Sequence, residues 1–248
     1  MNSQKMEAFI TGIGWVSKKS MGNPTSIQLF ENKFNLPFIK RKQIINNPYK
    51  PFGRMDTFSK LGFAAIAFAM DDAGITKEKN TKNPNNVSLI ASTTTGCIET
   101  DIKYRRTMAD HIPSPALFAY TLDSCFLGEA SIYFNLTGES FVVNEEKTNG
   151  LKGFFWAMET IDSGMSDTAL CGVCNSDMNI IDVDFTDIQD IPQIQSVQPG
   201  ALFFVIEKNP LHSYGNIIAT SPENFYYQND IKISNLYDLA AKCSMEKI

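Results

Sequence analysis

The segment from Gly138 to Asp177 constrains the fold more than any other part of the 248-residue chain. It contains a β-branched and aromatic run, Ser140–Asn144, then a polar turn, a long apolar stretch, Asn149–Ser163, and a second β-rich run, Thr168–Cys174. The two β-rich runs are typical of strands, whereas an apolar stretch of that length is typical of a helix. The order strand, helix, strand predicts a helix packed on a sheet.

The same alternation continues through the rest of the chain. Further strands are expected at Ala8–Ile13, Val87–Ala91, Gly200–Lys208 and Asn216–Thr220. Further helices are expected at Thr57–Ala73, Glu99–Asp110, Ala116–Phe126 and Leu236–Lys247. Asn23-Pro24 predicts one more helix start, because Asn can cap a first turn that contains Pro. The pattern predicts an α/β fold with α/β/α layering, and a single domain over residues 1–248, since no linker or internal repeat divides it.

The helix expected at Asn149–Ser163 is apolar on almost every side. Its large apolar residues are Leu151, Phe154, Phe155, Trp156, Met158 and Ile161. A helix of this kind must be buried all round. The cover is expected to be the C-terminal tail, residues 221–248, or another chain.

Composition excludes several classes of function. The formal net charge of −5 leaves no basic surplus to displace counterions, so nucleic-acid binding is not expected. No apolar run approaches the roughly 20 residues that span a bilayer. The odd number of cysteines, five in apolar surroundings, favours reduced thiols and a cytoplasmic location over a disulfide framework. The basic run Lys40–Lys42 is interpreted as a solvated loop, with docking of an acidic partner as the alternative.

Isolated motifs give no metal or cofactor site. Cys171 and Cys174 form a CxxC, but they fall in an expected buried strand without a second pair, so core thiols are favoured over zinc or redox chemistry. The histidines, His111 and His212, are expected to be surface or capping residues. Gly12-x-Gly14 lacks the third glycine of a dinucleotide fingerprint and predicts a strand-to-loop turn.

Five segments, in the right order, resemble the β-ketoacyl synthases of the thiolase-like fold. They are Phe9–Ser17, Arg54–Ile75, Asn86–Gly96, Phe134–Val143 and Pro199–Lys208. That family's fold has two similar halves, and this chain resembles the first. The resemblance implies a single thiolase-like half, with one mixed sheet and helices on both faces. In the family, the helix that corresponds to Asn149–Ser163 lies between the sheets of the two halves.

The resemblance also identifies the position of the family's nucleophile. Those enzymes carry a reactive Cys at the head of the buried helix, and the ninth residue after Gly138 is Lys147 here. A helix N-terminus stabilises a thiolate but disfavours an ammonium, so Lys147 needs Glu145, Glu146 or a partner's carboxylate beside it. The family's catalytic histidine pair lies in the second half, and neither histidine of this chain falls on its motifs. The resemblance therefore implies no catalytic residue, and Schiff-base chemistry at Lys147 is the alternative.

Within the family, the turn is most similar to that of chain-length factors, the non-catalytic partners of ketosynthases in type II polyketide systems. Their Glu-Gln-Ala-Gly-Gly-like run corresponds here to Glu146-Lys147-Thr148-Asn149-Gly150. Since Lys replaces Gln, a role of that Gln in decarboxylation is not carried over. Short chain-length factors of aryl polyene and flexirubin pathways are similar in length. The resemblance implies a catalytic β-ketoacyl synthase and an acyl carrier protein as partners.

Two sets of residues are implied to serve these partners. In the family, the strand that corresponds to Ser140–Asn144 pairs across the dimer two-fold axis, and an unpaired edge of this kind invites aggregation. The expected interface consists of Ser140, Phe141, Val142, Val143, Asn144, Glu145, Glu146 and Lys147. The region that lines the acyl tunnel of chain-length factors corresponds to Leu117, Phe118, Leu122 and Phe126, for which core packing is the alternative.

The leading hypothesis is a non-catalytic subunit of the chain-length-factor kind, which pairs with an active ketosynthase. One alternative is a condensing or thiolase-type acyltransferase that uses Lys147 or a displaced Cys as its nucleophile. The other is a homodimer that binds acyl chains or assembles a pathway.

Overall fold

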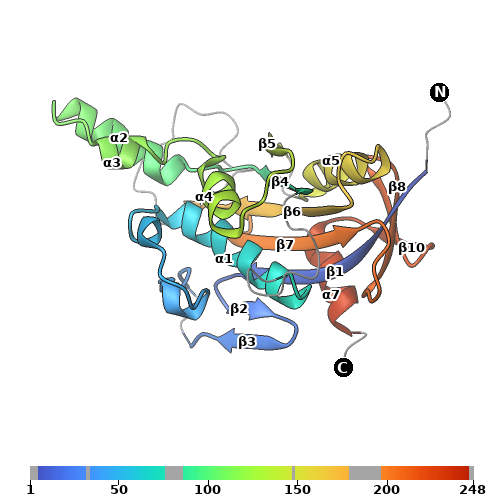
Figure 1. Ribbon diagram of the computed structural model, residues 1–248. Coiled ribbons are helices and arrows are strands. Elements are labelled where there is room, and N and C mark those ends of the chain that lie inside the picture. The colour runs from blue at the N-terminus through green and yellow to red at the C-terminus, as the bar shows by residue number, and fades with distance from the viewer. Residues whose placement is uncertain (1–4, 32–33, 76–85, 147–148, 179–196, 246–248) are drawn as a thin grey trace.

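The computed structural model describes residues 5–31, 34–75, 86–146, 149–178 and 197–245 (Figure 1). The strands are β1 (Met6–Val16), β2 (Ser20–Asn23), β3 (Ser26–Leu29), β4 (Val87–Thr93), β5 (Ser140–Asn144), β6 (Thr168–Asn175), β7 (Gly200–Glu207), β8 (Gly215–Ser221), β9 (Asn224–Tyr227) and β10 (Ile231–Ile233). The α-helices are α1 (Thr57–Asp72), α2 (Ile98–Ala109), α3 (Pro115–Phe118), α4 (Cys125–Phe134), α5 (Leu151–Asp162) and α7 (Leu236–Met245). Short 3₁₀ helices lie at Arg41–Gln43 and Lys50–Gly53. None of the described helices is long and apolar enough to cross a bilayer.

The described strands form one mixed sheet, in the order β10-β9-β8-β1-β7-β6-β4-β5. Strands β4, β5 and β6 are parallel, whereas β7 runs antiparallel to both of its neighbours, β6 and β1. The hairpin of β2 and β3 branches from the end of β1. Strand β5 therefore lies at one edge of the sheet and β10 at the other.

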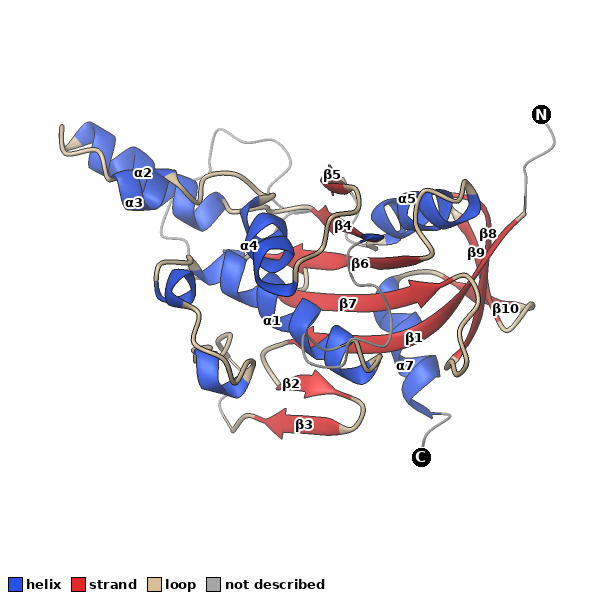
Figure 2. Cartoon of the chain, viewed as in Figure 1, coloured by secondary structure: helices blue, strands red, loops and turns tan. Residues whose placement is uncertain are grey.

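Helices cover both faces of this sheet (Figure 2). One apolar core joins α1 and α4 to alternate strand residues such as Leu170 and Phe203. The other core joins α5 and α7 to the strand residues that point to the opposite face, such as Cys171 and Phe204. Because strand side chains alternate between faces, strands that are apolar at every position can supply both cores. The predicted α/β layering, with helices on both faces of one mixed sheet, is confirmed.

Helix α1 is the best-predicted element of the chain. The Asp56 side chain caps it by accepting a 2.8 Å hydrogen bond from the Ser59 N–H, and Gly74, with φ of +69°, follows its end. Gly12 and Gly14 lie inside β1, where α1 crosses the strand so closely that a Cβ on Gly14 would fall 2.2 Å from the Ala69 nitrogen. The predicted strand-to-loop turn at these glycines is wrong, because they serve close packing and not a turn.

The helix predicted to start at Asn23-Pro24 is also wrong. These residues form the tight turn of the β2–β3 hairpin, in which Asn23 Oδ1 accepts hydrogen bonds from the Thr25 and Ser26 N–H groups at 3.1 and 2.8 Å. Asn followed by Pro begins a helix or a turn with the same local hydrogen bonds. The Asn23 amide then donates to Asp71 Oδ2 at 3.0 Å, which ties the hairpin to α1.

The helix predicted at Ala116–Phe126 is interrupted. Helix α3 ends at Phe118, and a turn leads to α4, which begins at Cys125. Thr121 and Asp123 lie in this turn, where the Asp123 carboxylate accepts the Cys97 N–H at 2.8 Å. Tertiary contacts of a polar residue thus override the local apolar pattern.

Within this chain, helix α5 is not buried all round. Leu151, Phe154 and Ile161 face the sheet and are buried, whereas Trp156 is 51% exposed. Part of the C-terminal tail packs against this helix, since the Phe225 ring contacts Phe154 and Phe155. At the start of the helix, the Leu236 N–H donates to the Asn149 carbonyl at 3.0 Å.

Candidate functional site

The turn between β5 and α5 carries a buried carboxylate. Glu145 follows directly after β5, and its residue is only 5% exposed. Its Oε1 accepts hydrogen bonds from the Ser92 hydroxyl at 2.6 Å and the Lys152 N–H at 2.8 Å, and its Oε2 accepts the Gly150 N–H at 3.0 Å. The Glu145 side chain therefore caps the helix from five residues before its Gly150 N-cap.

Every N–H group at the start of α5 has an acceptor. Besides the two that bond to Glu145, the Leu151 N–H donates to Asn149 Oδ1 at 3.1 Å, and the Gly153 N–H donates to the Ser92 hydroxyl at 2.9 Å. The first turn of a helix normally leaves its N–H groups free for a cap or a ligand. Here the protein's own side chains use all of these donors.

The other residues of this turn divide into exposed and undescribed ones. Glu146 is exposed, and Asn144 is also exposed at the end of β5. Lys147, at the position of the family's nucleophile, lies outside the described residues together with Thr148. Glu145 was expected as a counter-ion for Lys147, but among the described residues its partners are N–H and hydroxyl groups.

Strand β5 presents a free edge. It pairs with β4 on one side and has no partner on the other in the described part of the chain. The Glu139 carbonyl accepts from Leu89 and the Glu145 N–H donates to Thr93, so the odd-numbered residues bond toward β4. By the two-residue period of a strand, Ser140, Val142 and Asn144 direct their N–H and carbonyl groups away from the sheet.

The two helices that contact β5 each carry an exposed apolar side chain. Trp156 on α5 and Ile132 on α4 are both more than half exposed, and both helices contact β5 (Figure 1). Phe141 and Val142 are half-buried and pack against opposite cores. The described residues of the expected interface, from Ser140 to Glu146, thus lie on one edge, with Glu145 turned inward.

The four residues expected to line a tunnel differ in exposure and in the side chains that they contact. Phe126 is 1% exposed and packs between the rings of Phe58 and Phe203 in the core. Phe118 is 61% exposed and contacts the Tyr104 ring, and Leu122 is 66% exposed. Leu117 is half-buried on α3.

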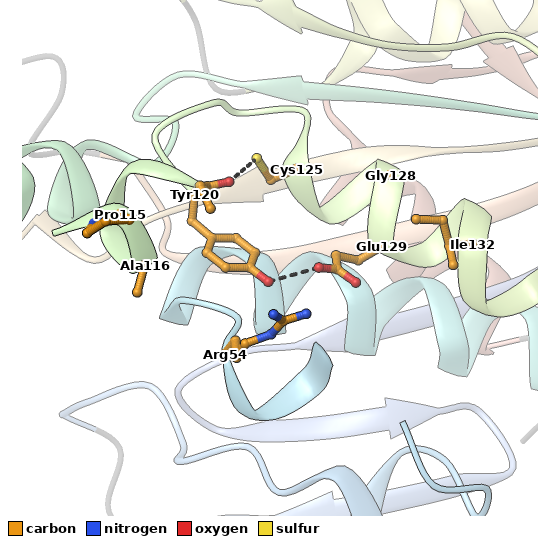
Figure 3. A pocket seen from close by; sticks show the side chains of 9 residues that line it. Arg54, Pro115, Ala116, Tyr120, Cys125, Gly128, Glu129 and Ile132 are labelled. Carbon is orange, nitrogen blue, oxygen red and sulfur yellow. Dashed lines mark hydrogen bonds between the residues drawn. The ribbon is translucent and has the colours of Figure 1, made fainter. Parts of the chain in front are cut away.

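A cavity of about 510 Å³ lies in the same region, with different lining residues (Figure 3). Helices α3 and α4 provide most of its wall, and the turn after α3 and Arg54 provide the rest. The lining residues are Arg54, Pro115, Ala116, Ala119, Tyr120, Cys125, Gly128, Glu129 and Ile132. Small residues on α3 and α4 leave this space, which a search for bulky apolar side chains could not find.

The Glu129 carboxylate is the polar centre of this cavity (Figure 3). It accepts hydrogen bonds from the Tyr120 hydroxyl at 2.8 Å and from the Tyr49 hydroxyl at 2.5 Å. Burial, and then the hydrogen bond to Glu129, raise the pKa of both tyrosines well above the ordinary value. Both hydroxyls therefore remain donors, and the Glu129 carboxylate accepts from both of them.

The cysteines and histidines form no second site among the described residues. All five cysteines are free, and Cys125 alone of them is not buried. Burial raises the pKa of the Cys171 and Cys174 thiols far above the ordinary value, which suits core residues. His212 lines a separate hollow near Asp72 and Glu207, and His111 lies beyond α2.

Comparison with known proteins places this arrangement in a family. The family model of the β-ketoacyl synthase N-terminal domain matches residues 43–190, which is more than half of the chain. The chain belongs to the β-ketoacyl synthase family. A search of curated proteins found no match.

Several solved structures share the β-ketoacyl synthase fold with this chain at low sequence identity. The ishigamide ketosynthase/chain length factor is 13% identical, with a TM-score of 0.61, over 86% of this chain and 65% of its own. The ketosynthase ApeO in complex with its chain length factor ApeC, from Xenorhabdus doucetiae, is 14% identical, with a TM-score of 0.56, over 83% of this chain and 81% of its own. A type II polyketide synthase acyl-carrier protein in complex with its ketosynthase, AntDE:AntF, is 16% identical, with a TM-score of 0.57, over 83% of this chain. This β-ketoacyl synthase-like chain spans 64% of that structure's length.

Proposed function

We propose that this protein is a non-catalytic ketosynthase-like subunit, similar to a chain-length factor, that pairs with an active β-ketoacyl synthase. Its setting would be fatty-acid or polyketide biosynthesis of the aryl polyene type, in the cytoplasm. The observation that carries the proposal is the turn before α5, where Glu145, Ser92 and Asn149 occupy every helix N–H group. The N–H groups of residues 150–153 are therefore not available to stabilise a thiolate or an oxyanion.

The free edge of β5 supports a partner that adds a strand. Its outward N–H and carbonyl groups offer hydrogen bonds, and the two helices that contact it add the exposed apolar side chains of Trp156 and Ile132. Structures similar to this chain include a ketosynthase with its chain length factor and a ketosynthase with an acyl-carrier protein. An active ketosynthase and an acyl carrier protein are therefore the proposed partners.

Co-expression with candidate ketosynthases tests the proposal. We expect the two chains to co-purify, and condensation of carrier-bound acyl groups to require both of them. Val142→Pro should abolish co-purification, because it removes an outward N–H while leaving the bonds to β4, and Val142→Ala should retain it. A monomer that binds no ketosynthase at micromolar concentration would contradict the proposal.

A homodimer through the same edge is the second candidate, since the β5 edge of one copy could pair with that of another. Purification as a stable dimer that ignores ketosynthases would favour it. The enzyme alternative requires the isolated chain to become acylated. Labelling by a thiol-directed inhibitor together with acyl transfer from a carrier protein would establish it.

A further inference from the structure

The start of α5 holds an anion that belongs to the chain itself. The two Glu145 oxygens lie 3.0 and 2.8 Å from the Gly150 and Lys152 nitrogens. These are the distances at which helix N–H groups bind an external carboxylate or an oxyanion. A buried carboxylate is costly to desolvate, so its hydrogen bonds and the positive end of the helix must offset that cost.

The remaining donors of the turn are used by neutral oxygens. Ser92 on β4 donates to Glu145 and accepts from Gly153, so its hydroxyl links the carboxylate to the helix. The Leu236 side chain packs over Gly150, where a Cβ would lie 2.6 Å from its Cδ1. Among the described residues, a substrate oxygen therefore finds no free N–H group from Gly150 to Gly153, and Leu236 fills the space beside Gly150.

We infer that Glu145 is an autoinhibitory anion, which closes the N-terminus of α5 to thiolates and acyl oxyanions. The inference rests on the proposed non-catalytic role and deepens it. Two features then prevent condensation chemistry. Lys147 stands in the sequence where the family has its thiol, and the Glu145 carboxylate occupies the helix N–H groups that would stabilise a thiolate. Restoring Cys at position 147 would then not restore an activated nucleophile.

Chemical rescue tests directly whether a carboxylate occupies the N-terminus of α5. Glu145→Ala should lower the melting temperature, and formate or acetate should recover at least half of that loss relative to chloride at equal ionic strength. The exposed neighbour Glu146 provides the matched control, since Glu146→Ala should show neither loss nor rescue. Equal responses of the Glu145→Ala and Glu146→Ala variants to carboxylates would overturn the inference.

Thiol reactivity tests the closure. In a Cys125→Ser background, which removes the half-exposed native thiol, Lys147→Cys should react with iodoacetamide at an ordinary thiol's rate at pH 7. Adding Glu145→Ala should speed the reaction about tenfold or more, because the helix N-terminus then lowers the thiol pKa. If the alanine variant does not fold, Glu145→Gln replaces it in this experiment, because it keeps the side-chain volume but removes the charge.

The two possible failures can be told apart. Equal alkylation rates for Lys147→Cys with and without the Glu145 change would refute the closure. If those same variants still co-purify with a ketosynthase, the subunit role stands. If co-purification is absent from the unmodified chain as well, the proposed function fails whatever the thiol does.

Discussion

Glu129 shows how a single carboxylate can organise the cavity between α3 and α4. Its two oxygens accept the Tyr49 and Tyr120 hydroxyls, which joins the segment before α1, the turn after α3, and α4. Hydrogen bonds to a charged acceptor contribute about 1.5–3 kcal/mol each, more than neutral ones. The cavity is therefore expected to keep its shape without a bound ligand.

Tyr120→Phe should lower the free energy of unfolding by about 1.5–3 kcal/mol at pH 8, measured by urea denaturation. It should also change the alkaline limb of stability. Because burial and Glu129 raise the folded-state pKa of Tyr120, the folded protein keeps a proton that the unfolded chain loses above about pH 10. The wild type should therefore lose stability as pH rises beyond that value, and the variant should lose less.

Tyr226 offers a control for the loss of this hydrogen bond, since its hydroxyl makes none among the described residues. Tyr226→Phe should leave the stability at pH 8 close to that of the wild type. An equal loss in the Tyr120 and Tyr226 variants would contradict the role given to Glu129.

At the residue scale, sequence reasoning succeeded where a side chain acts on its nearest neighbours. The Asp56 cap lies three residues from the N–H that it accepts. Glu145 acts across a loop of five residues and needs Ser92 from another strand, so no local spacing identifies it as a cap. The sequence indicated only that a carboxylate stood near Lys147.

At the scale of elements, the contact between β1 and α1 depends on glycines. Gly14→Ala should lower the free energy of unfolding by about 3 kcal/mol, because the new Cβ would fall 2.3 Å from the Ala65 carbonyl oxygen and neither backbone can withdraw. Urea denaturation measures this loss.

Gly128 is the matched control within a helix. A Cβ there meets nothing within 4 Å, so Gly128→Ala should stabilise α4 by about 0.5–1 kcal/mol through the higher helix propensity of alanine. Similar effects of the two alanine substitutions would show that the close approach of β1 and α1 is not what requires Gly14.

Element prediction failed where one pattern permits two structures. Asn23-Pro24 has the signal of a helix start, yet the hairpin forms because its Asn reaches Asp71 on α1. Strands β9 and β10 were not predicted, since runs of four and three residues are too short to show a period. The long elements α1, β4, β6 and β7 were predicted because most of their residues are apolar.

At the scale of the whole molecule, the cavity between α3 and α4 is a candidate end wall for an acyl channel formed with a partner. In a reconstituted pair, Phe118→Ala should lengthen the products by removing bulk from α3. Ala119→Phe should shorten them by filling the cavity that Ala119 lines. Mass spectrometry of the released chains measures both effects.

Leu211 gives the control for this experiment, because it is exposed and does not line the cavity. Leu211→Ala should leave product length unchanged. An unaltered product distribution for both variants would remove the cavity from consideration. The family resemblance directed the tunnel prediction to this region of the chain. It could not predict the lining residues, since an interrupted helix changes which side chains face inward.

The two ends of the sheet differ in a way that bears on assembly. The β5 end offers five residues with apolar neighbours, whereas the β10 end has three residues, with Lys232 exposed at its centre. Head-to-tail growth needs both ends to accept a strand, and a short edge with a charge resists this. We therefore expect such a chain to join one companion through β5 and to form no fibrous polymer, even when it is made in excess.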